Sequence, residues 1–315
     1  MSRVAWPSAL ASAAASVSSV AFAFAFAFAP LGCSSTAPPS SDPVDAGLDA
    51  APLEGVADAG REAGLDAGAD AATPSSGGTG GLACTRRDAL DPGHTVCVLK
   101  IGGTELKVVE PAAGAGPLVL ALYLHGDGAG AHKSGSALRT MAPWLDAARG
   151  LGVSVLAPNG CSWWQSPSHD CASAGSTSDR AADNTKALAG AFEALGRAYD
   201  LRTDRTYYYG SSGGSIFLTE QWLPLEGGRH PGVFALMCGG EATTRAFAWD
   251  PASATRRSRF GFTYGDQDFL KKDIEGAARA LRDKGLDVNE RVLPGAAHCA
   301  FDAHGEAVSV WSAAP

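Results

Sequence analysis

Several common sequence signatures are absent from this chain. Its seven cysteines include no Cys-x-x-Cys pair, which disfavours a zinc site, and no Asp-x-Asp-x-Asp-Gly loop of the kind that binds calcium is present. Positive charge is also scarce, since 25 Lys and Arg residues stand against 33 Asp and Glu, for a formal net charge of −8. Proteins that bind nucleic acid carry clustered basic residues. We therefore expect neither a bound metal nor a nucleic-acid partner.

The first 33 residues have the composition of a targeting segment. Arg3 precedes a long apolar stretch that ends in Ala-Phe repeats, and Pro30-Leu31-Gly32-Cys33 follows. A basic start, an apolar middle and small residues at the cut site are typical of a secretory signal. Cysteine after Leu-Gly resembles a bacterial lipobox, which implies lipidation of Cys33 and membrane contact through that lipid only, although Pro30 departs from the pattern. A plain signal peptide, with free secretion, and an uncleaved membrane-spanning anchor are the alternatives.

The next segment, 34–83, is dominated by Ala, Gly, Asp, Pro and Ser. It carries eight acidic residues against Arg61 alone, a charge of −7, so that the remaining 84–315 is nearly neutral. With almost no branched or aromatic side chains it cannot bury enough apolar surface to fold. We predict a disordered acidic linker over 34–83 and one folded domain over 84–315.

Within this domain, short apolar runs alternate with amphipathic segments. Continuous apolar runs such as 118–124 are typical of strands that are buried on both faces. Strands are expected at 96–101, 105–110, 118–124, 153–157, 206–209, 233–237, 259–264 and 289–293, and helices at 137–149, 183–199, 213–222 and 272–284. The first two strands form a hairpin around Gly102-Gly103. The alternation predicts an α/β fold with a mostly parallel central sheet and helices on both faces.

A nucleophile motif lies between the strand at 206–209 and the helix at 213–222. Gly210-Ser-Ser-Gly-Gly214 fits G-x-S-x-G, and the strand before it and helix after it are the context that a nucleophile elbow requires. A Gly-rich turn is the alternative interpretation. The motif predicts that Ser212 is a catalytic nucleophile, held in a strained turn.

A serine nucleophile needs a base, and an acid that orients the base. In the expected order of serine, acid and histidine, the favoured base is His298, in a loop directly after a predicted strand. His304, which we expect at the surface, and His230 also follow the serine. Asp268 is the favoured acid because it lies where the loop can turn back towards the His298 loop. Asp266, the alternative acid, has a turn-stabilising aspartate as its ordinary interpretation.

An acyl oxyanion needs two N–H donors. The backbone N–H of Gly213 directly follows the nucleophile, and we assign the second donor to the backbone N–H of Asp127, in the loop after the buried strand at 118–124. His125 in the same loop is interpreted as a packing residue that braces it.

These motifs together resemble a known family. Four segments occur in the order and spacing that α/β-hydrolases have. They are His125-Gly126, Gly210-Ser-Ser-Gly-Gly214, Gly265-Asp-Gln-Asp268 and Pro294-Gly-Ala-Ala-His298. The stretches Ala157-Pro-Asn-Gly-Cys-Ser-Trp-Trp164 and Asp200-Leu-Arg-Thr-Asp-Arg205 resemble the polyhydroxybutyrate depolymerase and feruloyl or acetylxylan esterase group. Ser211 departs from that group, which often has a bulky apolar residue there.

The resemblance implies the α/β-hydrolase fold and a serine carboxylic-ester hydrolase that works through an acyl-enzyme without a cofactor. The expected partner is an ester substrate, either polymeric or small. Trp163 and Trp164 resemble residues of a substrate platform, with ordinary core packing as the alternative. A non-catalytic binding protein displayed at the cell surface, and a peptidase on the same fold, are the other functions that the sequence leaves open.

Six cysteines remain beside Cys33, and an even number in an exported chain favours disulfides. One pair flanks a turn, a second brackets a loop of nine residues, and the third joins the end of a buried strand to the residue after His298. The predicted pairs are Cys84–Cys97, Cys161–Cys171 and Cys238–Cys299. Free buried thiols are the alternative for the last pair.

Overall fold

The structure is a computed structural model that describes residues 75–79, 81–90, 93–110, 116–168, 171, 181–251 and 258–314. These residues belong to one compact unit, Asp66–Pro315. The predictions for the targeting segment, for Cys33 and for nearly all of the acidic linker lie outside them. None of the described helices has the length and apolar character that a membrane crossing requires.

The strands form one sheet of nine strands in the order β1-β2-β3-β5-β4-β6-β7-β8-β9. Their bounds are β1 Arg86–Leu90, β2 His94–Ile101, β3 Thr104–Val109, β4 Leu118–Leu124, β5 Gly150–Val155, β6 Leu201–Ser211, β7 Gly232–Met237, β8 Arg259–Gly265 and β9 Asp287–Leu293. The first three strands are antiparallel, β3 pairs antiparallel with β5, and all pairs from β5 through β9 are parallel.

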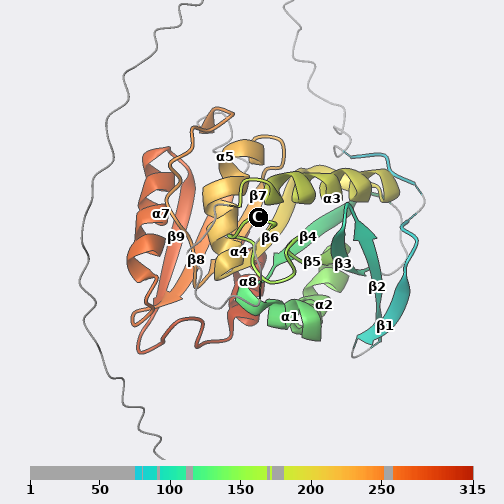
Figure 1. The fold of residues 1–315 in the computed structure, drawn as a ribbon, viewed down its shortest axis with the longest axis horizontal. Helices are drawn as coiled ribbons and strands as arrows, with labels where there is room; N and C mark the ends of the chain where they lie inside the picture. The colour runs from blue at the N-terminus through green and yellow to red at the C-terminus, as the bar shows by residue number, and fades with distance from the viewer. Residues whose placement is uncertain are drawn as a thin grey trace, which may run out of the picture. The chain divides into compact units, whose positions relative to one another are not determined.

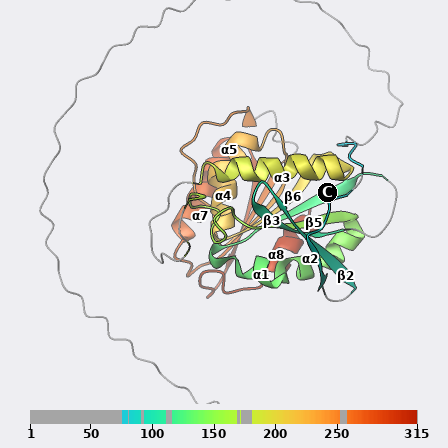
Figure 2. The ribbon, with the colours of Figure 1, turned by 45° about the vertical axis from the view of Figure 1, so that its right-hand side comes forward.

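Helices cover both faces of this sheet (Figures 1 and 2). Their bounds are α1 Gly130–Ser134, α2 Ser136–Ala148, α3 Asn184–Ala198, α4 Gly213–Phe217, α5 Leu223–Glu226, α7 Lys271–Asp283 and α8 Ala303–Ser312. A 3-10 turn at Asp127–Ala129 precedes α1, and a π-helical turn at Leu218–Trp222 joins α4 to α5.

The alternation of side chains along the central strands divides the core into two layers. In β4, Leu120, Leu122 and Leu124 pack in the cluster that includes α3 and α7, whereas Ala121 and Tyr123 pack in the cluster that includes α2 and α8. Successive residues of a strand point to opposite faces, so a strand covered on both faces must be apolar throughout. This is why 118–124 carries no polar residue apart from the tyrosine hydroxyl.

The connections place a topological switch point at β4. The chain passes from β4 to β5 on one side and then crosses to β6 on the other. In open parallel sheets, ligands bind outside the carboxyl ends of the strands at such a point. The chain has the α/β-hydrolase fold that the sequence predicts, and the loops after β4 and β6 meet at this edge of the sheet.

Three features differ from the sequence prediction. β1 was not predicted, because its residues are mostly exposed and polar at the edge of the sheet. The helix α8 was missed because its sequence shows little separation of polar and apolar faces, although Trp311 is buried and its Nε1–H donates to the Tyr208 carbonyl at 3.1 Å. The helix after Ser212 continues four residues beyond the predicted end, through α5.

Candidate active site

Ser212 occupies a strained turn between β6 and α4. Its φ of 48° and ψ of −115° lie in a region that residues with a β-carbon rarely adopt. The flanking glycines are required by close contacts, since a β-carbon at Gly210 would lie 2.7 Å from the Ser215 Cα and one at Gly214 would overlap the Leu124 carbonyl oxygen. The turn therefore presents the Ser212 hydroxyl above the ends of β4 and β6.

The hydroxyl of Ser212 is one end of a chain of hydrogen bonds. Its Oγ lies 3.0 Å from Nε2 of His298, and Nδ1 of His298 lies 2.9 Å from Oδ1 of Asp268. The carboxylate can only accept, so Nδ1 carries the hydrogen and Nε2 is free to accept the serine proton. The Asp268 side chain has no exposed surface, and the His298 side chain is 23 % exposed. The structure thus brings together the three residues that the sequence analysis selected.

The two candidate acids have different surroundings. Asp268 accepts from His298 and, through the same oxygen, from the Leu270 N–H at 2.9 Å. Asp266 instead accepts the Gly295 N–H at 2.7 Å, which joins the loop after β8 to the loop that carries His298. The Gln267 N–H donates across the same junction to the Ala296 carbonyl at 3.0 Å. Asp268 is therefore the carboxylate in contact with His298, and Asp266 stabilises the turn.

A disulfide lies beside His298. Cys238, at the end of β7, is bonded to Cys299, and their Cα atoms are 5.2 Å apart. Both residues have positive φ, 43° and 51°. Together with His298 they place three potential metal-ligand atoms within 4.8 Å of one another. Since thiolates are what bind metals, the disulfide removes both sulfur ligands from such a set.

The other two disulfides join the pairs expected from the sequence. Cys161 and Cys171 close the loop after β5, with Cα atoms 5.7 Å apart. Cys84 and Cys97 join the segment before β1 to β2, with Cα atoms 5.2 Å apart.

The loop after β4 packs against Ser212. A β-carbon at Gly126 would lie 3.2 Å from the Ser212 Cβ. The next residue is Asp127, whose backbone N–H is the predicted second donor to the oxyanion, and this assignment stays a prediction. Sequence reasoning missed the role of the Asp127 side chain. Its carboxylate accepts from the Ser162 hydroxyl at 2.6 Å and from Nε1–H of Trp164 at 2.9 Å. Asp127 thereby joins the loop after β4 to the disulfide-closed loop after β5.

The two adjacent tryptophans differ in position. Trp163 is fully buried and packs against Phe217 with ring centroids 5.0 Å apart, so the prediction that it contacts substrate is wrong and the alternative, core packing, explains its position. Trp164 is partly exposed and lies against the first residue after the nucleophile, since a β-carbon at Gly213 would be 2.5 Å from its Cδ1. Trp164 is therefore the one of the two tryptophans that has exposed surface beside Ser212.

Two buried histidines brace the loop after β4. His125 accepts the Ala157 N–H on Nε2 at 2.9 Å, so its Nδ1–H donates to the Gly126 carbonyl at 2.7 Å. Burial lowers the pKa of His125 to about 4, which keeps the ring neutral. This agrees with the bracing role predicted from the sequence.

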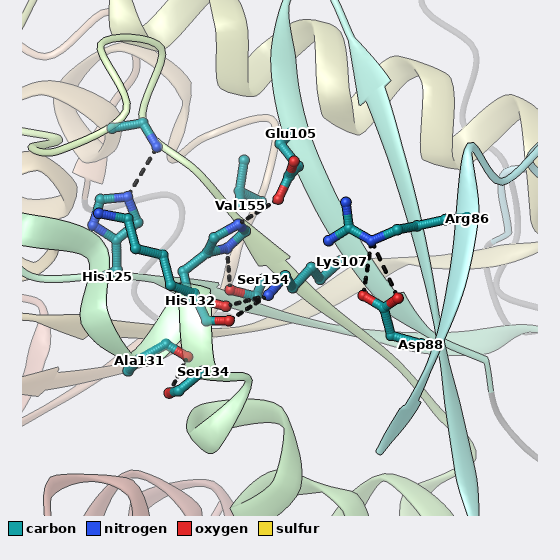
Figure 3. A network of polar contacts seen from close by, with 12 residues as sticks. Arg86, Asp88, Glu105, Lys107, His125, Ala131, His132, Ser134, Ser154 and Val155 are labelled. Carbon is teal, nitrogen blue, oxygen red and sulfur yellow. Dashed lines mark hydrogen bonds and ion pairs between the residues drawn. The ribbon is translucent and has the colours of Figure 1, made fainter.

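The second buried histidine was not singled out by the sequence. Nδ1 of His132 lies 2.7 Å from the Ser154 hydroxyl, and its Nε2 lies 3.4 Å from Glu105 (Figure 3). Burial lowers the pKa of His132 to about 3. Beside it, the ammonium of Lys107 donates to the carbonyls of His132 and Lys133 at 2.8 Å each, at the end of α1. These contacts fix the short helix α1, and through it the loop that carries Asp127.

Comparisons with known proteins show similarity in structure but not in sequence. No protein-family model matches this chain. No curated protein matches it either. One similar solved structure is an esterase from Rhizomucor miehei, with 12 % identity over 72 % of this chain and 85 % of that chain, at a TM-score of 0.47. Another is an esterase from Pyrobaculum calidifontis, with 13 % identity, 73 % and 86 % coverage and a TM-score of 0.45. An S-formylglutathione hydrolase from Staphylococcus aureus has 11 % identity, 71 % and 99 % coverage and a TM-score of 0.46.

The remaining candidate histidines lie away from Ser212. His304 is partly buried, with Nδ1 2.7 Å from the Tyr209 hydroxyl and Nε2 3.2 Å from the Ser136 hydroxyl, so the prediction of a surface position is wrong. His230 packs against Phe192 with ring centroids 4.3 Å apart and stacks on Trp222 with ring centroids 5.5 Å apart, and burial lowers its pKa to about 4.

One side chain at the site was missed altogether. Phe269 directly follows Asp268, its ring centroid lies 4.4 Å from that of His298, and it is 76 % exposed. An aromatic residue next to a candidate acid is the sequence signal that could have drawn attention to it.

Proposed function

We propose that this protein is a serine hydrolase of carboxylic esters that works through an acyl-enzyme. The observation that carries the proposal is the continuous hydrogen-bonded chain from Ser212 through His298 to the buried Asp268. A serine hydroxyl becomes a nucleophile only when a base takes its proton, and a base in the correct tautomer is what this chain provides.

In the acylation step, Ser212 Oγ attacks the ester carbonyl carbon while Nε2 of His298 takes the hydroxyl proton. The carbonyl oxygen becomes an oxyanion that accepts from the backbone N–H groups of Gly213 and Asp127. As the carbon–oxygen bond to the alcohol breaks, the imidazolium returns its proton to the leaving oxygen. Asp268 stabilises the imidazolium that forms and holds its orientation.

Deacylation repeats these steps with water as the nucleophile. Nε2 of His298 takes a proton from water, the hydroxide adds to the acyl carbon, and the acid is released as Ser212 regains its proton. These steps are complete with the residues named, and they require no cofactor.

The test pairs a covalent probe with an ester panel. The wild-type protein is expected to be labelled by a fluorophosphonate and to hydrolyse short-chain nitrophenyl esters, whereas Ser212→Ala should lose labelling and lower kcat by about 10⁴- to 10⁶-fold. Activity of Ser212→Ala within about tenfold of wild type would remove this serine from the mechanism. Absence of labelling and turnover in the wild type would favour a binding protein, and cleavage of peptides but not esters would favour a peptidase.

Within the ester hydrolases, we favour substrates of the polyester and plant-wall class. The support is the resemblance of 157–164 and 200–205 to the polyhydroxybutyrate depolymerase and feruloyl or acetylxylan esterase group, and the partly exposed Trp164 beside Gly213. A panel of methyl ferulate, acetylated xylan and a hydroxybutyrate oligomer tests the class. Hydrolysis of simple short-chain esters alone would contradict it.

The leader and the cysteines support a proposal for the cellular location of the protein. Disulfides persist in oxidising compartments, so the three bridges support export. We propose that lipidation of Cys33 anchors the exported protein to a bacterial membrane, with two or more acyl chains needed for stable binding at about 0.8 kcal/mol per buried CH₂. Cys33→Ser should move the protein from the membrane fraction to the soluble fraction. Unchanged membrane association would instead indicate an uncleaved apolar helix.

A further inference from the structure

Phe269 is the most exposed large apolar side chain in the part of the chain that the structure describes. It is 76 % exposed, and Val292, at 42 %, is the other such residue there. Single exposed apolar residues are ordinary on protein surfaces. The position of Phe269 is what distinguishes it, since its ring centroid lies 4.4 Å from that of His298 at an angle of 42°. One face of the proposed base is therefore continuous with an open aromatic surface.

The backbone around Phe269 is held on both sides. The Asp268 N–H donates to the Gly265 carbonyl at 3.2 Å, and the Leu270 N–H donates to the Asp268 carboxylate at 2.9 Å. The helix α7 then begins at Lys271, whose N–H donates to the Asp268 carbonyl at 3.0 Å. A ring on such a support needs little further ordering to bind a ligand. The backbone that carries the Phe269 ring is thus fixed by hydrogen bonds on both sides.

The chemistry of ester cleavage decides which half of a substrate lies there. The carbonyl oxygen must face the N–H groups beside Ser212, where Trp164 packs against Gly213. The leaving oxygen must come within about 2.6–3.2 Å of His298 Nε2 to receive its proton. Because the Phe269 ring lies against the His298 ring, it is the exposed apolar surface available beside the imidazole to a group attached to the leaving oxygen.

We propose that Phe269 is the binding surface for the leaving alcohol, and that the preferred alcohol presents a flat face to this ring, as an aromatic ring or the apolar face of a sugar ring does. The proposal rests on the ester hydrolase function proposed above and adds the substrate half that determines specificity. A flat ring covers the open face of Phe269 by offset stacking, which removes apolar surface of both rings from water. A small aliphatic alcohol reaches the imidazole but covers little of that face.

The experiment moves one aromatic ring from the alcohol to the acyl side of the ester. Ethyl acetate, benzyl acetate and ethyl phenylacetate all release a primary alcohol, either ethanol or benzyl alcohol. The intrinsic rate of ester cleavage is therefore similar across the set. Hydrolysis is followed by pH-stat titration for wild type, Phe269→Ala and Phe269→Leu, with Val292→Ala as the control for loss of an exposed apolar side chain. Thermal unfolding checks that each variant is folded.

Wild type is expected to prefer benzyl acetate over ethyl acetate by about tenfold in kcat/KM. In Phe269→Ala, kcat/KM for benzyl acetate should fall about tenfold more than for either of the other two esters, mainly through KM. Phe269→Leu should lie between, and Val292→Ala should match wild type. The apparent pKa in the pH profile of kcat/KM should be the same in wild type and Phe269→Ala.

Three results would overturn the alcohol site while leaving the ester hydrolase in place. They are the absence of a preference for benzyl acetate in wild type, an equal loss on all three esters in Phe269→Ala, and a selective loss on ethyl phenylacetate. An equal loss with a shifted pH profile would identify Phe269 as a residue that only positions His298. A wild type that hydrolyses none of the three esters would overturn the proposed function itself, and the alcohol site with it.

Discussion

Removal of the Cys238–Cys299 disulfide is expected to lower stability and turnover together. The bridge closes a sequence separation of 61 residues, so the chain-entropy relation assigns it about 4 kcal/mol at 25 °C. The same relation assigns about 3 kcal/mol to Cys84–Cys97, with a separation of 13. The double variants Cys238→Ala/Cys299→Ala and Cys84→Ala/Cys97→Ala therefore form a matched pair with similar expected losses of stability.

The two variants should differ in turnover. Cys299 directly follows His298, and both bridged residues hold the positive φ values of 43° and 51°. Without the bridge, the loop that carries the base is held by fewer constraints. A displacement of about 1 Å in a catalytic group can cost about 10²-fold in rate, so we expect kcat to fall by about 10- to 100-fold. The Cys84–Cys97 bridge lies at the antiparallel edge of the sheet, and its loss should leave kcat within about twofold of wild type.

Stability is measured by guanidinium unfolding at 25 °C. The kcat is measured on a short-chain nitrophenyl ester without denaturant, under conditions in which circular dichroism shows that both variants are folded. A loss of stability in the Cys238/Cys299 variant with unchanged kcat would refute the reasoning, because the bridge would then stabilise the fold without positioning the base. Equal losses of kcat in both variants would also refute it, since they would reflect general loosening.

Three further outcomes follow from contacts at the site. Asp268→Asn should lower kcat by about 10⁴-fold by favouring the wrong tautomer of the base, and Asp266→Asn by less than about tenfold; steady-state kinetics with the reverse ranking would identify Asp266 as the acid. Trp164→Phe keeps an aromatic ring but deletes the donor to Asp127, and saturation curves should show KM raised about fivefold with a smaller change in kcat, whereas a change in kcat alone would contradict a role in binding. Burial lowers the pKa of His132 from 6.5 to about 3. As the pH falls below about 6.5, this histidine therefore takes up a proton in the unfolded chain but not in the folded protein. The contribution of His132 should lower the free energy of unfolding by about 1.4 kcal/mol for each pH unit. His132→Gln should make the pH dependence of unfolding between about pH 6.5 and 5 shallower by that amount, and an unchanged slope would show that this histidine does not contribute.

The local features of the fold were predictable from the sequence because they depend on residues close together in the chain. The apolar run 118–124 became β4 with the same bounds, since a strand covered on both faces needs apolar residues throughout. The elbow at Ser212 was recognisable because its tight turn requires glycine at fixed positions before and after it. The order of serine, acid and histidine then limited the candidates to a few residues in three loops.

Other features depended on which loops meet, and a one-dimensional pattern does not contain that information. Asp266 and Asp268 are two residues apart in one loop, and only the fold shows that one carboxylate contacts Nδ1 of His298 while the other bonds the Gly295 N–H. Trp163 and Trp164 are adjacent and chemically identical, yet one faces the core and the other faces Gly213.

The sequence by itself determined the fold class, the elbow and the candidate residues, because strand burial, turn geometry and motif order are local properties. The tertiary structure decided the partners. The packing of the loops after β4, β5, β8 and β9 around Ser212 brought the Trp164 donor to the Asp127 carboxylate and placed Phe269 against His298. These contacts join residues that are distant in the chain, so they arise only when the parallel sheet brings the carboxyl ends of its strands to one edge.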